Sequence, residues 1–140
     1  MDLPLSRMLR QFETTSGAAE HLIESLISYA TTRLPNDYIS FLHQSNGAIG
    51  VGPNLYVVLW RAEEIVQLNE ASGVREFAPG LLLIGSDGCG NLLGIDTRSM
   101  MPEEMTYVWV DSMSLEWDEI RHTADSLGDL LEHLDQYYGK

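Results

Sequence analysis

Hydrophobic residues along this chain form two continuous runs near its middle and helical stripes toward both ends. The runs lie at residues 81–84 and 92–95, and a glycine-rich link joins them. A four-residue apolar run bounded by turn residues is typical of a strand that is covered on both faces. Within the link, Asp87 and Asn91 can bond their own backbones as turn residues do. The pattern therefore predicts a buried β-hairpin at the centre of the chain.

The stripes predict helices on both sides of this hairpin. Apolar side chains recur at helical spacing in each of them, with polar side chains on the opposite face. Ser16 is a suitable cap for the second helix, and Asp125 or Ser126 for the last one. Helices are expected over residues 5–12, 18–30, 34–45, 61–69 and 127–138.

The remaining apolar segments predict strands. Two flank the hairpin, at residues 55–60 and 105–110, and both are rich in aromatic and branched side chains. A weaker strand is expected to include Leu115, Trp117 and Ile120, whose spacing partly alternates. Strands and helices do not alternate regularly, which favours an α+β fold with a mostly antiparallel sheet. Helices would pack on one face of this sheet and at its ends.

Length and composition predict one domain, residues 1–140. The chain has 140 residues, of which 44% are hydrophobic, enough apolar material for one core. Its single cysteine, Cys89, cannot form an intramolecular disulfide, which favours a reducing compartment. The first residues lack the pattern of a secretion signal, and no apolar stretch approaches the length of a membrane span. We therefore expect a cytoplasmic protein that does not bind membranes.

Charge is unevenly distributed along the chain. The formal net charge is −13, and residues 1–60 contribute −2 whereas residues 61–140 contribute −11. A strongly electronegative surface repels nucleic acids and anionic membranes, and it accelerates association with basic partners. Direct nucleic-acid binding is therefore disfavoured, and a basic protein partner is favoured. The simpler alternative is that the acidity only keeps the protein soluble.

No constellation in the sequence carries recognisable catalytic chemistry. The glycine-rich link lacks the lysine of a phosphate-binding loop, and the residues after Gly90 form a strand rather than a helix. Cys89 has no local base to activate it, and the four histidines are not spaced as metal ligands. We therefore expect no catalytic residue, no metal and no cofactor.

Several motifs together resemble the SMI1/KNR4 family, also called the SUKH superfamily. They are the segments 34–38 and 41–42, Asn46–Gly47, the strand end at 59–60, the hairpin residues 84–91 with 95–96, and the segments 125–127 and 130–131. The resemblance covers roughly residues 18–135. Two positions depart from the common pattern, since Asn91 replaces an acidic residue and Leu127 replaces an aromatic one.

The resemblance implies an SMI1/KNR4-like α+β domain without catalytic residues. Bacterial members of the family are regarded as immunity proteins that bind and neutralise toxins, many of which are nucleases. Fungal members act as scaffolds in cell-wall signalling. The leading hypothesis is therefore an immunity protein that binds a basic toxin domain. A scaffold with the same fold, and an enzyme that uses Cys89 or the carboxylates, are the alternatives.

The candidate partner-binding residues are acids in the second half of the chain. Several of them lie beside tryptophans, which can anchor interfaces, although sheet packing explains each tryptophan more simply. Asp87 is expected both to stabilise the hairpin turn and, from an exposed tip, to meet a basic partner. The candidates are Glu63, Glu64, Asp87, Glu103, Glu104, Asp111, Glu116, Asp118 and Glu119.

Overall fold

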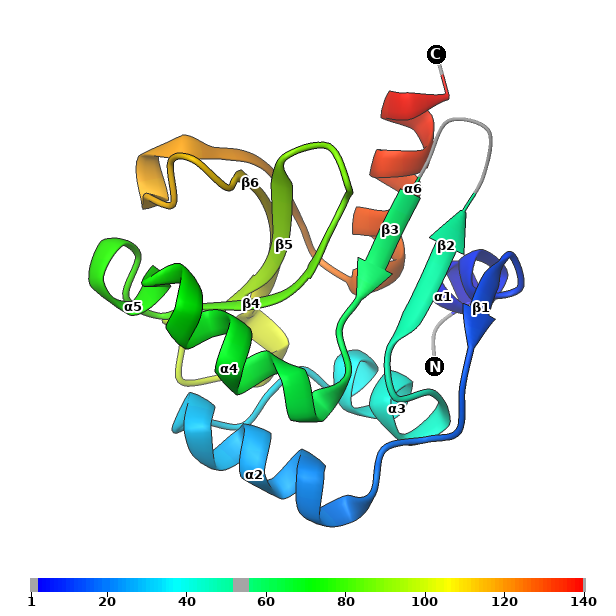
Figure 1. Ribbon diagram of the computed structural model, residues 1–140, viewed down its shortest axis with the longest axis horizontal. Helices are drawn as coiled ribbons and strands as arrows, with labels where there is room; N and C mark the ends of the chain where they lie inside the picture. Colours follow the sequence, from blue (N-terminus) through cyan, green and yellow to red (C-terminus); the bar gives the residue numbers. More distant parts are fainter. Residues whose placement is uncertain (1–2, 52–55, 140) are drawn as a thin grey trace.

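The computed structural model describes residues 3–51 and 56–139, and one antiparallel sheet runs through it. Each strand pairs with its neighbours in the sequence, so the sheet is a meander from β1 to β7 (Figure 1). The strands are β1 (Phe12–Thr14), β2 (Ala48–Val51), β3 (Tyr56–Leu59), β4 (Leu81–Ser86), β5 (Asn91–Asp96), β6 (Thr106–Asp111) and β7 (Ile120–Ala124). The prediction of an α+β fold with a mostly antiparallel sheet is confirmed.

The expected helices are present, together with a short additional one, α5. The first was expected to include Phe12, which is wrong, because α1 ends at Leu9 and Phe12 begins β1. The helix α6 is capped as predicted, because Ser126 Oγ accepts a hydrogen bond from the N–H of Asp129 at 3.1 Å. The predicted Ser16 cap is wrong, since α2 begins after Ala19 and has no side-chain cap. The helices are α1 (Leu3–Leu9), α2 (Glu20–Ala30), α3 (Asn36–Gln44), α4 (Ala62–Ser72), α5 (Val74–Phe77) and α6 (Leu127–Tyr138), with 3-10 turns η1 (Pro102–Glu104) and η2 (Trp117–Glu119).

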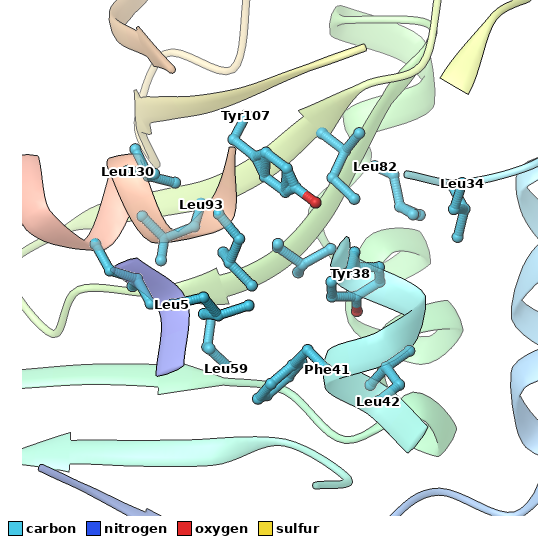
Figure 2. Packing of buried hydrophobic residues seen from close by; sticks show 14 of the residues in the cluster. Leu5, Leu34, Tyr38, Phe41, Leu42, Leu59, Leu82, Leu93, Tyr107 and Leu130 are labelled. Carbon is cyan, nitrogen blue, oxygen red and sulfur yellow. The ribbon is translucent and has the colours of Figure 1, made fainter. Parts of the chain in front are cut away.

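Strand β4 is covered on both faces, as its continuous apolar run predicts. Successive side chains of a strand point to opposite faces, so Leu82 and Ile84 join one cluster while Leu81 and Leu83 join another. The larger cluster receives buried side chains from α1, α3 and α6 (Figure 2). The smaller cluster on the other face is closed by α5 and by the connection between β6 and β7.

The weaker predicted strand is partly wrong. Strand β7 begins only at Ile120, and Leu115 and Trp117 lie in the connection before it. Leu115 packs into the smaller cluster, while the indole N–H of Trp117 donates to the carbonyl of Pro79 at 3.1 Å. The apolar spacing there reflects a loop folded over the sheet. Residue 55 of the predicted strand 55–60 lies outside the described residues.

Two strands were not predicted, β1 at one edge of the sheet and β2 beside it. Strand β1 has three residues, and β2 lies in a glycine-rich segment that reads as a connection. Gly50 of β2 pairs with Phe12 of β1, and the phenyl ring occupies the space where a side chain at position 50 would lie. The glycine therefore serves close packing between strands rather than a turn.

A buried amide completes the backbone hydrogen bonding of β4. Strands β3 and β4 are in register at Val58 with Ser86 and at Leu59 with Gly85, and the N–H of Trp60 donates to the carbonyl of Ile84 at 2.9 Å. Further along β4, the N–H of Leu83 donates to Asn69 Oδ1, and the carbonyl of Leu83 accepts from Asn69 Nδ2, both at 2.8 Å. The side chain of Asn69 thus takes the place of a neighbouring strand, which satisfies two buried backbone groups.

Replacing Asn69 with leucine tests this role. The substitution preserves approximate size but leaves the N–H and carbonyl of Leu83 without partners. We expect the free energy of unfolding to fall by about 2–4 kcal/mol, measured by urea denaturation. The control is Gln67→Leu on the exposed side of α4, for which we expect a change within about 0.5 kcal/mol. An Asn69→Leu variant as stable as the control would contradict this role.

Candidate functional site

Asp87 is buried, and the prediction that it lies at an exposed tip is wrong. Its relative exposure is 1%. One carboxylate oxygen, Oδ1, accepts from the backbone N–H groups of Cys89 at 2.8 Å and Asn91 at 3.1 Å. The other, Oδ2, accepts from Asn91 Nδ2 at 3.0 Å, Trp109 Nε1 at 2.8 Å and the Tyr138 hydroxyl at 2.7 Å. A carboxylate offers about four acceptor positions, so this one has no capacity left for a partner.

Hydrogen bonding determines the ionisation of Asp87. Burial alone would raise the pKa of this carboxyl, but donors from Tyr138, Cys89, Asn91 and Trp109 outweigh burial and hold the pKa below its ordinary value. The pKa of Tyr138 is raised, first by burial and then by its hydrogen bond to Asp87. The two shifts agree on an ionised carboxylate that accepts from a protonated phenol.

A layer of side chains surrounds the Trp109 indole beside this carboxylate. The ring meets Tyr137 edge-on at 5.0 Å between centroids, and the guanidinium carbon of Arg121 lies 4.6 Å from its centroid. Arg121 Nη1 also donates to Asn91 Oδ1 at 3.1 Å. The amide of Asn91 therefore donates to Asp87 and accepts from Arg121. A carboxylate at position 91 could not donate to Asp87, so the amide suits this position.

The structure does not bring the other predicted acids into one cluster, and instead distributes them over three parts of the fold. The first pair lies in the first turn of α4, the second pair lies in η1 before β6, and the rest lie at the end of β6 and in the connection after it. They are Glu63 and Glu64, then Glu103 and Glu104, and finally Asp111, Glu116, Asp118 and Glu119. Asp111 is half-buried and the other seven are exposed.

The first two groups include acids that hold local structure. Glu64 Oε1 accepts from the backbone N–H of Arg61 at 3.1 Å, which caps the start of α4. Glu63 Oε1 accepts from Asn46 Nδ2 at 2.7 Å, and this hydrogen bond, the largest cause, lowers the pKa of Glu63. In η1, Glu104 Oε2 accepts from the hydroxyl of Ser99 at 3.0 Å.

The third group lies in the acidic loop, by which we mean residues 111–119. This segment contains four acids and no basic residue. Asp111 Oδ1 accepts from the N–H of Met113 at 2.8 Å, and the N–H and hydroxyl of Ser112 both donate to the carbonyl of Gly90, at 3.0 and 2.7 Å. The start of the acidic loop is therefore fixed to the turn that Asp87 organises.

Two exposed apolar side chains accompany the acidic loop, and the sequence did not identify them as candidates. Met113 is 89% exposed and Phe77 of α5 is 55% exposed. Both line one cavity of about 250 Å³, together with Leu115 and Glu116. In Figure 1, α5 and the orange connection after β6 lie on the same side of the molecule. An apolar residue within an acidic segment is a sequence signal for Met113, whereas Phe77 had none.

A larger cavity of about 510 Å³ lies between the end of α2, α5 and the start of β4. Its charged lining residues are Arg75 and Arg98. Arg98 pairs with Asp96 at 2.8 Å and lies 3.5 Å from the ring centroid of Trp117. Arg75 lies 3.6 Å from a carboxylate oxygen of Glu70. Both guanidinium groups are thus already paired within the protein.

Two histidines meet between α6 and the sheet, His133 from the helix and His122 from β7. The rings of His122 and His133 are stacked in parallel, with centroids 3.5 Å apart. The spacing of these residues in the sequence gave no indication of this contact. Over residues 3–51 and 56–139, no three side chains of metal-binding type come together.

The meander sheet with helices on its flanks defines a small α+β domain, and a comparison with known families identifies it further. The model of the SMI1 / KNR4 family (SUKH-1) matches residues 17–133, so the chain belongs to this family. Membership suggests an immunity-type protein-binding domain, and domains of this type are generally not catalytic. No curated protein matches the chain. Within the described part of the chain, no helix is long and apolar enough to cross a membrane.

Replacing Asp87 with asparagine tests its structural role. The amide keeps an oxygen for the backbone donors but places an NH₂ group opposite Trp109 Nε1 and the Tyr138 hydroxyl. We expect the free energy of unfolding to fall by about 2–4 kcal/mol in urea denaturation. The control is Asp118→Asn in the acidic loop, an exposed site, which should change stability by less than about 0.5 kcal/mol. Equal stabilities of the two variants would contradict the role of Asp87.

The same carboxylate predicts a dependence of stability on pH. The pKa of Asp87 lies below its ordinary value of 3.8 in the folded protein. Its stabilising contribution is therefore complete above that value and is lost as pH falls through the folded-state pKa. We expect the difference in unfolding free energy between wild type and Asp87→Asn to shrink between about pH 5 and about pH 2. A difference that stays constant over this interval would be inconsistent with an ionised Asp87.

Proposed function

We propose that this protein is a non-enzymatic immunity protein that binds and neutralises a cognate toxin. Membership of the SMI1/KNR4 family carries the proposal, because it suggests an immunity-type protein-binding domain. The composition supports a basic partner, since the formal net charge is −13 and most of it comes from residues 61–140. A single thiol, Cys89, suits a reducing compartment. We place the encounter with the toxin in the cytoplasm.

The partner-binding surface would consist of the predicted acids without Asp87, whose carboxylate is buried. The acidic loop contributes four of them and contains no basic side chain that would offset their charge. A nuclease presents a basic groove to the phosphate backbone, and carboxylates can occupy the place of the phosphates. Complementary charge would also steer the two proteins together and make the association rate sensitive to salt.

Coexpression tests the immunity function. A host that expresses a toxin encoded beside this gene should stop growing, and coexpression of this protein should restore growth. The purified pair should form a complex whose association rate falls steeply as salt rises. A toxin that remains lethal despite full expression of this protein would contradict the proposal. Stable association with a neutral protein, without rescue, would instead favour a scaffold.

A pair of charge-neutralising variants tests the acidic surface. Glu116→Gln combined with Asp118→Asn removes two charges from the acidic loop, and we expect the association rate with the toxin to fall about tenfold at low salt. The control, Glu13→Gln combined with Glu24→Gln, removes the same charge from exposed sites in the first half of the chain. Stopped-flow mixing measures both rates. Equal rates for the two double variants would exclude a local role for the acidic loop.

A further inference from the structure

We propose that Phe77 and Met113 form an apolar anchor site, and that a basic protein partner inserts one aliphatic or aromatic side chain there. The site is the cavity of about 250 Å³ that the two residues line between α5 and the acidic loop. The inference rests on the proposed function for the identity of the partner. It adds the place of contact and the chemistry of the group that is bound.

Exposure of the two side chains is the first observation. Single exposed apolar residues are common on protein surfaces and need no explanation. Here a methionine that is 89% exposed and a phenylalanine that is 55% exposed come from different elements and face one cavity. Leu115, which lines the same cavity, is itself buried in the smaller core cluster. The cavity therefore brings two exposed apolar side chains beside a residue of the core.

The size of the cavity favours a side chain as its occupant. Sites for small molecules usually enclose about 300–1,000 Å³, and this cavity is smaller. The serines of positions 72, 112 and 114 also line it, so polar groups stand beside the apolar side chains. Interfaces between proteins likewise combine apolar anchor residues with polar groups around them.

Charge around the cavity identifies the partner as basic. Glu116 lines the cavity, and the acidic loop that forms one wall contains no Lys or Arg. On α5, Arg75 is engaged with Glu70 at 3.6 Å and lies over the ring of Tyr29. A partner that placed carboxylates around the anchor would meet repulsion, whereas lysines or arginines there would be attracted.

The anchor site is also held in place before binding. The N–H of Met113 donates to Asp111 Oδ1, and Ser112 is bonded to the carbonyl of Gly90. A loop that is already ordered loses less entropy when a partner binds. Met113 is thus presented on a fixed backbone, although its side chain is exposed.

Substitution with aspartate separates the anchor from general electrostatics. Met113→Asp adds a negative charge, so binding that depended on charge alone would become tighter with a basic partner. If Met113 is part of an apolar anchor site, Met113→Asp should bind the partner at least tenfold more weakly. This is about the effect of losing a central interface residue. The control is Met100→Asp, because Met100 is 88% exposed and lies before β6 whereas Met113 lies after it. We expect its affinity to stay within about twofold.

Calorimetry with the toxin encoded beside the gene measures these affinities, and thermal unfolding confirms that each variant is folded. If the wild-type protein neutralises the toxin and Met113→Asp binds it as tightly as Met100→Asp does, the anchor site is wrong and the proposed function stands. Loss of binding by Met113→Asp alone, with Met113→Leu close to wild type, would support it.

A second measurement does not depend on the toxin. Protein labelled with ¹³C at the methionine methyl groups is titrated with the peptide acetyl-Lys-Arg-Leu-Phe-Arg-Lys-amide, and a second peptide replaces each basic residue with glutamate. We expect the methyl signal of Met113 to shift with the basic peptide only, while that of Met100 stays in place. If Met113 does not shift at millimolar basic peptide, or shifts equally with both peptides, the inference is wrong. A selective shift without any neutralised toxin would keep the anchor site and reject the immunity function.

Discussion

The buried carboxylate of Asp87 is the interaction on which the centre of this structure depends. An ionised group that is taken out of water destabilises the fold unless hydrogen bonds replace its hydration. Asp87 obtains five donors, from its own turn, from β6 through Trp109, and from the end of α6 through Tyr138. Meeting this one requirement fixes the hairpin turn, the middle of the sheet and the C-terminal helix relative to one another.

The elements that sequence could predict are those whose signal is local. The hairpin, β6 and the long helices follow from apolar runs and stripes that their own residues contain. The burial of Asp87 could not be predicted, because Trp109 and Tyr138 are 22 and 51 residues away in the chain. Asn69 is a similar case, since its amide completes a strand 14 residues further on. In both, a polar residue is buried because of tertiary contacts that periodicity does not reveal.

Sequence likewise predicts only part of the candidate surface, namely the part whose residues are close together in the chain. Composition identified the acids, and their sequence neighbourhood placed four of them in one segment. It could not indicate that Leu115 and Trp117 turn back over the sheet and bring this segment beside α5. Phe77 had no signal at all, because α5 is a single turn that lacks a stripe. The apolar part of a surface built from a short helix and a loop can therefore be recognised only from the fold.

A series of hydrogen bonds connects the buried Asp87 to the exposed Met113. Asp87 holds the turn that contains Gly90, the carbonyl of Gly90 holds Ser112, and Ser112 adjoins the exposed Met113. Charge acts over about 8 Å in physiological salt and mainly accelerates encounter, so it tolerates some movement of the carboxylates. An apolar anchor acts only on contact and mainly slows dissociation. It therefore requires a fixed position, which Asp87 supports through the Gly90 turn and Asp111 supports directly at the N–H of Met113.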